Sequence, residues 1–380
     1  MKKEKNPRLN QVGGQAVLEG VMMKAGSDCA TACRRGDGSI VVLPREFHSV
    51  RKKLRLLNLP ILRGIVNFIE MLVLSMRILT ASAEVVVEEE ELTESKLERW
   101  MQKHLGIKLF DLLMVFSAVL GVILALALFL FLPRLAADGV EALINLFIEP
   151  NVDLSVWRAV IEGGLKICIF ISYLLLVGLM PDIRRTFEYH GAEHKSIACY
   201  ESGDELTPEN ASRHRRFHPR CGTSFMFFMI LLGILVGFLI RWIIPNLGPW
   251  AYFLIRLAIL PLVVGVGYEF IMFAGKHDNM FVRILSAPGL WVQGLTTREP
   301  NLEMLEVAII SLKCAMRDED PEFRAFYEAR AWEPKPEPKT AAEDAEAAAT
   351  LIVENKDELL PKQRAKADGE LADLSGSEEK

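Results

Sequence analysis

The chain has 380 residues, of which 51% are hydrophobic and 24% are charged, and its formal net charge is −5. Acidic residues concentrate at residues 88–91 and after Pro334, whereas basic residues lie beside long apolar blocks. This distribution does not support a nucleic-acid-binding protein, and it fits a protein in contact with a lipid bilayer. The six cysteines include no Cys-x-x-Cys pair, so we expect free thiols rather than a disulfide framework.

Residues 1–58 are expected to form a small cytoplasmic β-rich unit. One strand is predicted at 15–23 and another at 29–35, followed by a turn at 36–39 and a returning strand at 40–43. Two or three strands of this size are only marginally stable alone. The unit should therefore pack on the membrane domain or on a partner subunit.

Residues 59–106 are expected to contain two helices. Segment 59–80 is long and apolar, but Arg63, Asn67, Glu70 and Arg77 recur at helical spacing and form a narrow polar stripe. A fifth crossing would make the number of spans odd and place a basic flank outside the cell. We therefore predict a helix that lies in the cytoplasmic membrane interface, followed by a charged soluble helix over residues 84–105.

Four further apolar blocks, at residues 110–132, 156–180, 224–244 and 250–274, each reach the ~20 residues that a helix needs to cross hydrocarbon. They define a membrane domain at residues 107–275. The predicted fold class is mainly α: a polytopic helical membrane protein with four transmembrane helices, an interfacial helix and a small N-terminal β-rich unit.

The placement of lysine and arginine predicts the orientation of the chain. Both are frequent before the first block and in segment 181–223, whereas segments 133–155 and 245–249 contain only Arg134. The positive-inside rule then places both termini and segment 181–223 in the cytoplasm. We expect a multi-pass protein of the cell inner (plasma) membrane.

The two regions that follow membrane spans are predicted to be cytoplasmic. In segment 181–223, a helix should run over residues 182–200, and Thr207 with Pro208 should start a short second helix. Segment 276–333 is expected to contain a loop, continuing to about residue 293, and then an amphipathic helix. Residues 334–380 are predicted to be a disordered tail.

The sequence Tyr-His-Gly-Ala-Glu-His-Lys at residues 189–195 is the strongest candidate for chemistry. On a helix, His190 and His194 project from the same face one turn apart and could bind one metal ion. Glu193 is the candidate catalytic base, because a carboxylate beside a metal ligand can take a proton from bound water. Alternatively, the two histidines form a polar helix face that binds nearby carboxylates or lipid phosphates.

Three further candidate metal ligands are predicted at the same membrane level. His218 is expected to be the third ligand, ahead of Cys221 and Glu269. A carboxylate inside a span, such as Glu269, is energetically costly and usually functional, although it could instead pair with an arginine. The expected cofactor is a divalent metal, with zinc favoured over magnesium because nitrogen ligands predominate, and an open position would remain for water.

Five sequence blocks resemble the signature blocks of the YqhQ-like family of uncharacterised bacterial multi-pass membrane proteins: residues 13–23, 188–195, 218–224, 288–291 and 295–300. Together these blocks extend over roughly residues 10–316, and their shared order makes the resemblance specific. The family is often described as a group of predicted metal-dependent enzymes, so the resemblance implies the same histidine site.

Three functions are compatible with these features. A metal-dependent, hydrolase-like membrane enzyme would act at the cytoplasmic face on a peptide, amide, membrane-protein or lipid-linked substrate. A non-catalytic membrane scaffold or biogenesis factor would use a structural metal site or none. An ion or metal transporter is least favoured, because the first span is nearly devoid of ionisable groups. A homo-oligomer is compatible with all three.

Overall fold

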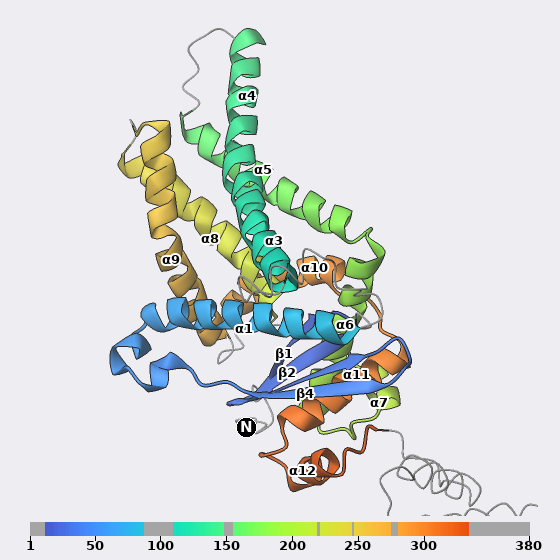
Figure 1. Ribbon diagram of the computed structural model, residues 1–380. Helices are drawn as coiled ribbons and strands as arrows, with labels where there is room; N and C mark the ends of the chain where they lie inside the picture. Colours follow the sequence, from blue (N-terminus) through green and yellow to red (C-terminus); the bar gives the residue numbers. More distant parts are fainter. Residues whose placement is uncertain are drawn as a thin grey trace, which may run out of the picture. The chain divides into compact units, whose positions relative to one another are not determined.

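The computed structural model describes residues 12–86, 109–147, 155–218, 221–244, 247–274 and 280–333. Most of the charged helix predicted at 84–105 and the tail predicted at 334–380 lie outside these ranges. Within them the protein is mainly helical, with one antiparallel sheet near its N-terminus (Figure 1).

The helices follow one another in chain order after the sheet. They are α1 (Leu62–Val86), α3 (Leu109–Leu126), the π-helical η4 (Ala127–Phe131), α4 (Leu132–Phe147), α5 (Ser155–Val177), α6 (Pro181–Ser202), α7 (Pro208–Ser212), α8 (Gly222–Ile243), α9 (Pro249–Ala274), α10 (Met280–Thr296), α11 (Leu302–Ala315) and α12 (Pro321–Glu328). Two short 3₁₀ helices, η1 (Val50–Lys52) and η2 (Arg55–Asn58), precede α1.

The sheet is a meander of four strands, β1 (Val12–Val17), β2 (Gly20–Ala25), β3 (Asp28–Arg34) and β4 (Ile40–Glu46), paired in the order β1-β2-β3-β4. The single strand predicted over residues 15–23 was wrong, because a two-residue turn divides it between Val17 and Gly20. Glu19 occupies this turn with a φ of 48°, a left-handed conformation that closes tight hairpins.

The two faces of the sheet pack against different helices because strand side chains alternate. Met22, Cys29 and Cys33 face α1 and pack with its Leu74 and Ile78. The intervening residues of β2 and β3 join the largest buried cluster together with α6 and α11. The sheet therefore lies between α1 on one face and α6 with α11 on the other (Figure 1), and it is not an independent unit.

Five helical stretches are long and apolar enough to cross a membrane. Four correspond to the predicted spans: Phe116–Phe147, Val160–Val177, Phe225–Ile243 and Trp250–Ala274. The fifth is α1. The first of the four is longer than the predicted block at 110–132, because the π-helical η4 precedes Pro133 and the helix continues through α4.

The prediction of a loop from residue 276 to about residue 293 was also wrong. The residues of the expected loop from 280 onward form α10, which contains Pro288 in its interior. The helix persists because its inward face is packed: Val292 joins a buried cluster with Phe170 and Phe227, and Gln293 is fully buried. Tertiary packing thus outweighs the helix-breaking tendency of proline and glycine.

Candidate metal centre

The histidine motif lies on α6, a helix with well-formed ends. Pro181 occupies the first turn together with Asp182, where a missing N–H and a negative charge are favourable. Gly203 ends the helix in the left-handed conformation, and its N–H donates to the carbonyls of Cys199 and Tyr200. The predicted helix over residues 182–200 is therefore confirmed.

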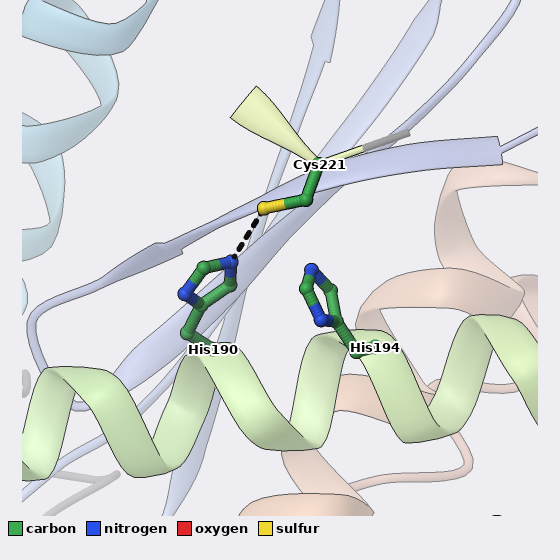
Figure 2. A group of neighbouring side chains, drawn as sticks. All are labelled: His190, His194 and Cys221. Carbon is green, nitrogen blue, oxygen red and sulfur yellow. Dashed lines mark hydrogen bonds between the residues drawn. The ribbon is translucent and has the colours of Figure 1, made fainter. Parts of the chain in front are cut away.

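His190 and His194 project from the same side of α6 (Figure 2), with ring centroids 4.4 Å apart. Cys221, at the N-cap of α8, points toward both rings, and its Sγ lies 3.2 Å from Nε2 of His190. One ligand atom from each of the three residues lies within 4.8 Å of the others. The structure thus brings Cys221 next to two histidines that precede it by at least 27 residues in the sequence.

Backbone carbonyls orient both imidazoles. Nδ1 of His190 lies 2.8 Å from the carbonyl oxygen of Thr296, and Nδ1 of His194 lies 2.5 Å from that of Arg216. A carbonyl oxygen only accepts hydrogen bonds, so each Nδ1 donates one, and in the neutral form of the imidazole Nε2 keeps its lone pair. Metal-binding histidines commonly have this arrangement, since the carbonyl fixes both tautomer and ring orientation.

The donor set fits zinc. Tetrahedral zinc with imidazole and thiolate ligands places its donor atoms about 3.3–3.8 Å apart, so the 4.8 Å group needs only a small contraction. Burial lowers the pKa of His194, which favours the neutral form that binds metals. Two nitrogens and one sulfur are softer donors than magnesium or calcium prefer.

Glu193 lies beside this group and does not belong to it. Its carboxylate packs against β1, where the backbone N–H of Gly14 donates a hydrogen bond to it. A side chain at position 14 would meet that carboxylate, because an added Cβ would lie 2.9 Å from Glu193 Oε1. Burial raises the pKa of Glu193 to about 7, an effect that the nearby His190 and the Gly14 hydrogen bond oppose.

His218, predicted as the third ligand, is near the group but outside it. Its ring centroid lies 5.7 Å from that of His194, and its Nε2 lies 3.6 Å from the carboxylate of Glu201. Gln293 of α10 holds the backbone of His218 from both sides, accepting from its N–H and donating to its carbonyl. Cys221 lies closest to the two histidines because its thiol faces His190, whereas the imidazole of His218 faces Glu201 farther along α6.

Glu269, the other predicted ligand, is not brought to the site. Its carboxylate forms an ion pair with Arg63 and accepts a 3.2 Å hydrogen bond from the backbone N–H of Ile61. The alternative interpretation of Glu269 as an arginine partner is therefore the one the contacts support. This arginine belongs to α1, which packs beside α9.

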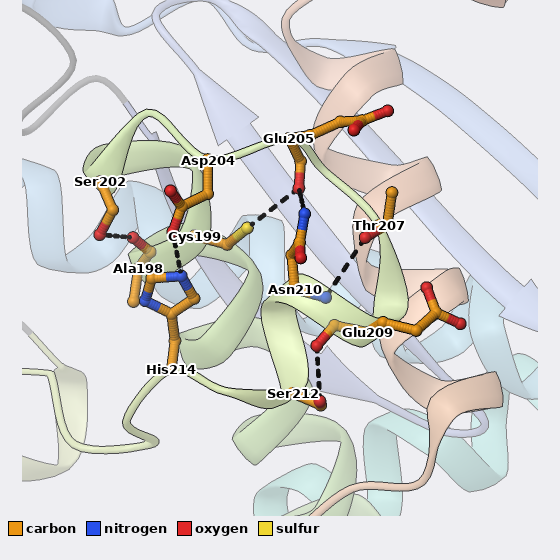
Figure 3. Close-up of polar contacts among 10 residues, drawn as sticks. All are labelled: Ala198, Cys199, Ser202, Asp204, Glu205, Thr207, Glu209, Asn210, Ser212 and His214. Carbon is orange, nitrogen blue, oxygen red and sulfur yellow. Dashed lines mark hydrogen bonds and ion pairs between the residues drawn. The ribbon is translucent and has the colours of Figure 1, made fainter.

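The loop between α6 and α8 is held by its own polar contacts (Figure 3). Thr207 caps α7 by accepting a hydrogen bond from the Asn210 N–H, as predicted for this position. His214 binds the carboxylate of Asp204 at 2.9 Å and so lies away from the metal candidates. These contacts stabilise the segment that leads to Arg216, whose carbonyl oxygen contacts Nδ1 of His194.

Close packing explains the glycine within the histidine motif. An added Cβ on Gly191 would lie 2.0 Å from the carbonyl oxygen of Arg298, in the segment between α10 and α11. The Arg298 N–H also donates to the carbonyl of Phe187, one turn before the motif. Sequence reasoning missed Thr296 and Gln293, although both lie in or near the blocks at 288–291 and 295–300.

Glu19 connects the β1–β2 turn to α6. It pairs with Arg185 and accepts a 3.3 Å hydrogen bond from the hydroxyl of Tyr189, so the β1–β2 turn is attached to α6 just before His190. Burial is the main cause that raises the pKa of Tyr189.

These observations define a helical protein with membrane-length helices, a small N-terminal sheet and a His–His–Cys cluster. Residues 59–318 match the family described as "Protein of unknown function (DUF1385)", and the chain belongs to that family. It is also 35% identical over 309 residues to "Uncharacterized protein YqhQ" of Bacillus subtilis (strain 168), in an alignment covering 80% of this chain and 92% of that protein. The resemblance to the YqhQ-like family is confirmed. No solved structure matches the chain.

Proposed function

We propose that the protein is a membrane-bound, metal-dependent enzyme of hydrolase type, with zinc held by His190, His194 and Cys221 at the cytoplasmic face. The observation that carries this proposal is the group of three donor atoms within 4.8 Å, together with a carbonyl partner on each histidine Nδ1. Three protein ligands leave a fourth tetrahedral position for water, as in catalytic rather than structural zinc sites.

The residues of the chain have separate roles in this proposal. The three ligands bind the ion, and the carbonyls of Thr296 and Arg216 keep the imidazoles in the ligating tautomer. When bound, zinc would lower the pKa of a coordinated water and polarise a substrate carbonyl. Glu193 is the proposed proton acceptor, since it is the buried carboxylate next to His194 in sequence and lies near His190 in space.

The proposed topology has four spans and an interfacial α1. One side of the C-terminal half of α1 contacts the sheet: Leu74 and Ile78 are buried there, and Ser75 donates to the side chain of Gln15. The residues of α1 that pack against this sheet cannot also be surrounded by hydrocarbon. The exposed apolar residues on α1, which include Phe68, Ile69, Leu72 and Val73, would then face the acyl chains.

Basic residues before α1 support the same topology. Arg51, Lys52, Lys53 and Arg55 lie in or beside η1 and η2, next to the exposed Leu54 and Leu56. Such a mixture fits the anionic cytoplasmic leaflet. Epitope tags at both termini test the topology: with four crossings, neither tag should be cleaved by protease added to sealed spheroplasts. Cleavage of one tag only would indicate five crossings.

Metal analysis of the purified full chain tests the site directly. The wild-type protein should contain about one zinc per chain, and the His190→Ala/His194→Ala double variant should contain almost none. His214→Ala is the matched control, because this histidine lies in the same loop and pairs with Asp204. Equal, near-zero zinc in the wild type and the double variant would refute the proposal.

Glu193→Gln separates an enzyme from a scaffold with a structural metal. In the enzyme, this variant should keep its zinc and lose turnover, measured with peptide, amide and lipid-linked ester substrates. In a scaffold or biogenesis factor, the same variant should keep both its zinc and its effect on the cell. The buried position of Glu193 beside the ligands, with room left by Gly14, favours the enzyme.

A further inference from the structure

A second polar site lies at the other end of the membrane helices. Helix α8 begins next to Cys221 and ends at Ile243, and a cavity of about 680 Å³ opens beside Arg241 in its last turn. Residues from η4, α4, α5 and α9 complete the cavity wall. The cavity is therefore separated from the candidate metal centre by the length of a membrane-spanning helix.

The wall of this cavity carries both signs of charge. It includes three arginines and three carboxylates: Arg134, Arg241, Arg256, Asp138, Glu141 and Glu162. Ionisable groups at membrane depth are costly and usually mark a ligand or ion site. A wall with equal numbers of both charges favours a zwitterionic ligand over a simple anion or cation.

Two of the arginines are positioned by one aromatic ring. The guanidinium carbon of Arg241 lies 4.6 Å from the ring centroid of the buried Tyr252, and that of Arg256 lies 5.3 Å from it. Arg256 also pairs with Glu162, which Lys166 holds from the other side at 2.6 Å. Among the described residues, no carboxylate forms an ion pair with Arg241. Its side chain hydrogen-bonds that of Tyr252, so its positive charge is left for an anionic group.

The rest of the wall is apolar and open to the surroundings. Phe131, Leu135 and Trp250 line the cavity and are 43%, 55% and 70% exposed. A ligand that contacts these side chains and the charged wall together must itself be amphipathic. Tryptophan is also typical of the membrane–water interface, where phospholipid head groups lie.

We propose that this cavity binds the head group of a zwitterionic phospholipid that carries a primary ammonium, of the phosphatidylethanolamine class. Arg241 and Arg256 would bind the phosphate, and Asp138 and Glu141 would accept hydrogen bonds from the ammonium. A choline head group lacks N–H donors, and a glycerol head group lacks the cation. The site should therefore distinguish these three lipids when their acyl chains are identical.

Binding to the detergent-purified full chain tests this proposal, with lipid retention measured by native mass spectrometry. Phosphatidylethanolamine should be retained in preference to phosphatidylcholine and phosphatidylglycerol. Arg241→Gln should weaken that retention about tenfold or more, because a charge-assisted bond is lost. Arg324→Gln, which changes an exposed arginine on α12, should leave it unchanged. Equal retention of the three lipids, or no effect of Arg241→Gln, would overturn the proposal.

A second variant keeps the test valid if Arg241→Gln does not fold. Glu141→Gln should reduce the preference for phosphatidylethanolamine over phosphatidylglycerol, because it removes a negative charge near the ammonium. Soluble phosphoethanolamine and inorganic phosphate should not compete at millimolar concentration; competition by either would show that the ligand is a free phosphate compound and not a lipid. Zinc content is independent of these results, so this proposal can fail without affecting the metal site.

Discussion

Replacing Gly191 by alanine should destabilise the protein and disturb the metal centre. The added Cβ would lie 2.0 Å from the Arg298 carbonyl oxygen, so this backbone must move by about 1 Å to reach an acceptable contact. Such overpacking destabilises a protein by about 1–3 kcal/mol. The same movement would weaken the hydrogen bond from the Arg298 N–H to the Phe187 carbonyl, which costs a further ~0.5–1.5 kcal/mol. The higher helix propensity of alanine offsets about 1 kcal/mol of this loss, which leaves a net destabilisation of about 0.5–3.5 kcal/mol.

Gly294→Ala is the matched control for this change. Gly294 is also helical, but an added Cβ would meet nothing within 4 Å, so alanine should stabilise the protein by about 0.5–1 kcal/mol. Thermal unfolding in detergent, followed by tryptophan fluorescence, should separate the two variants clearly. Zinc content should fall only in Gly191→Ala, because the Thr296 carbonyl that orients His190 lies two residues before Arg298. Equal melting temperatures and equal zinc contents would refute the packing inferred for Gly191.

Substitutions at three further positions test other contacts of the site. Gly14→Ala should lower stability by about 1–3 kcal/mol by crowding the Met22 carbonyl and Glu193, whereas Gly13→Ala, with nothing within 4 Å, should not. Similar melting temperatures for the two variants would refute these contacts. Cys221→Ser should keep the N-cap of α8 but lose most of the bound zinc. Cys221→Ala should lose the zinc and also about 1 kcal/mol of stability, because the cap is removed. Full zinc occupancy in either variant would exclude the thiol as a ligand. Glu269→Gln should leave zinc content unchanged, as measured by metal analysis, and a loss of zinc would restore Glu269 as a ligand.

The helices that depend on strong local signals could be predicted from the sequence. The apolar blocks predicted the membrane-length helices, and α6 has nearly the bounds predicted for it, since Pro181 and Gly203 mark its ends. Errors occurred where tertiary contacts outweigh local preference. A loop was predicted to continue to about residue 293, but the buried face of α10 keeps this segment helical despite Pro288. The β1–β2 turn was missed because Leu18 and Glu19, its central residues, are neither glycine nor asparagine.

The candidate site shows the same division. His190 and His194 are one helical turn apart, so their approach follows from α-helix geometry alone. Which residue completes the group depends on how the chain returns after residue 218, and this is set by Gln293 of α10, 75 residues farther along. Sequence spacing could rank His218, Cys221 and Glu269 only by depth in the membrane. It could not show that Glu269 binds Arg63 of α1.

The candidate metal centre lies where the sheet-bound part of the chain meets the membrane helices. His190 and His194 belong to α6, which packs mainly on β1 and α11, whereas Cys221 caps the first turn of the membrane-length helix α8. A metal bound to all three residues would therefore connect the two parts directly. Because the Thr296 carbonyl comes from the end of α10, which packs on α8, a shift of α8 would alter both a ligand and the orientation of His190. Zinc affinity should thus depend on the membrane environment of α8, and the same chain should hold zinc more tightly in lipid nanodiscs than in short-chain detergent. Equal affinities in the two environments, measured by chelator competition, would indicate that the site forms independently of the membrane helix.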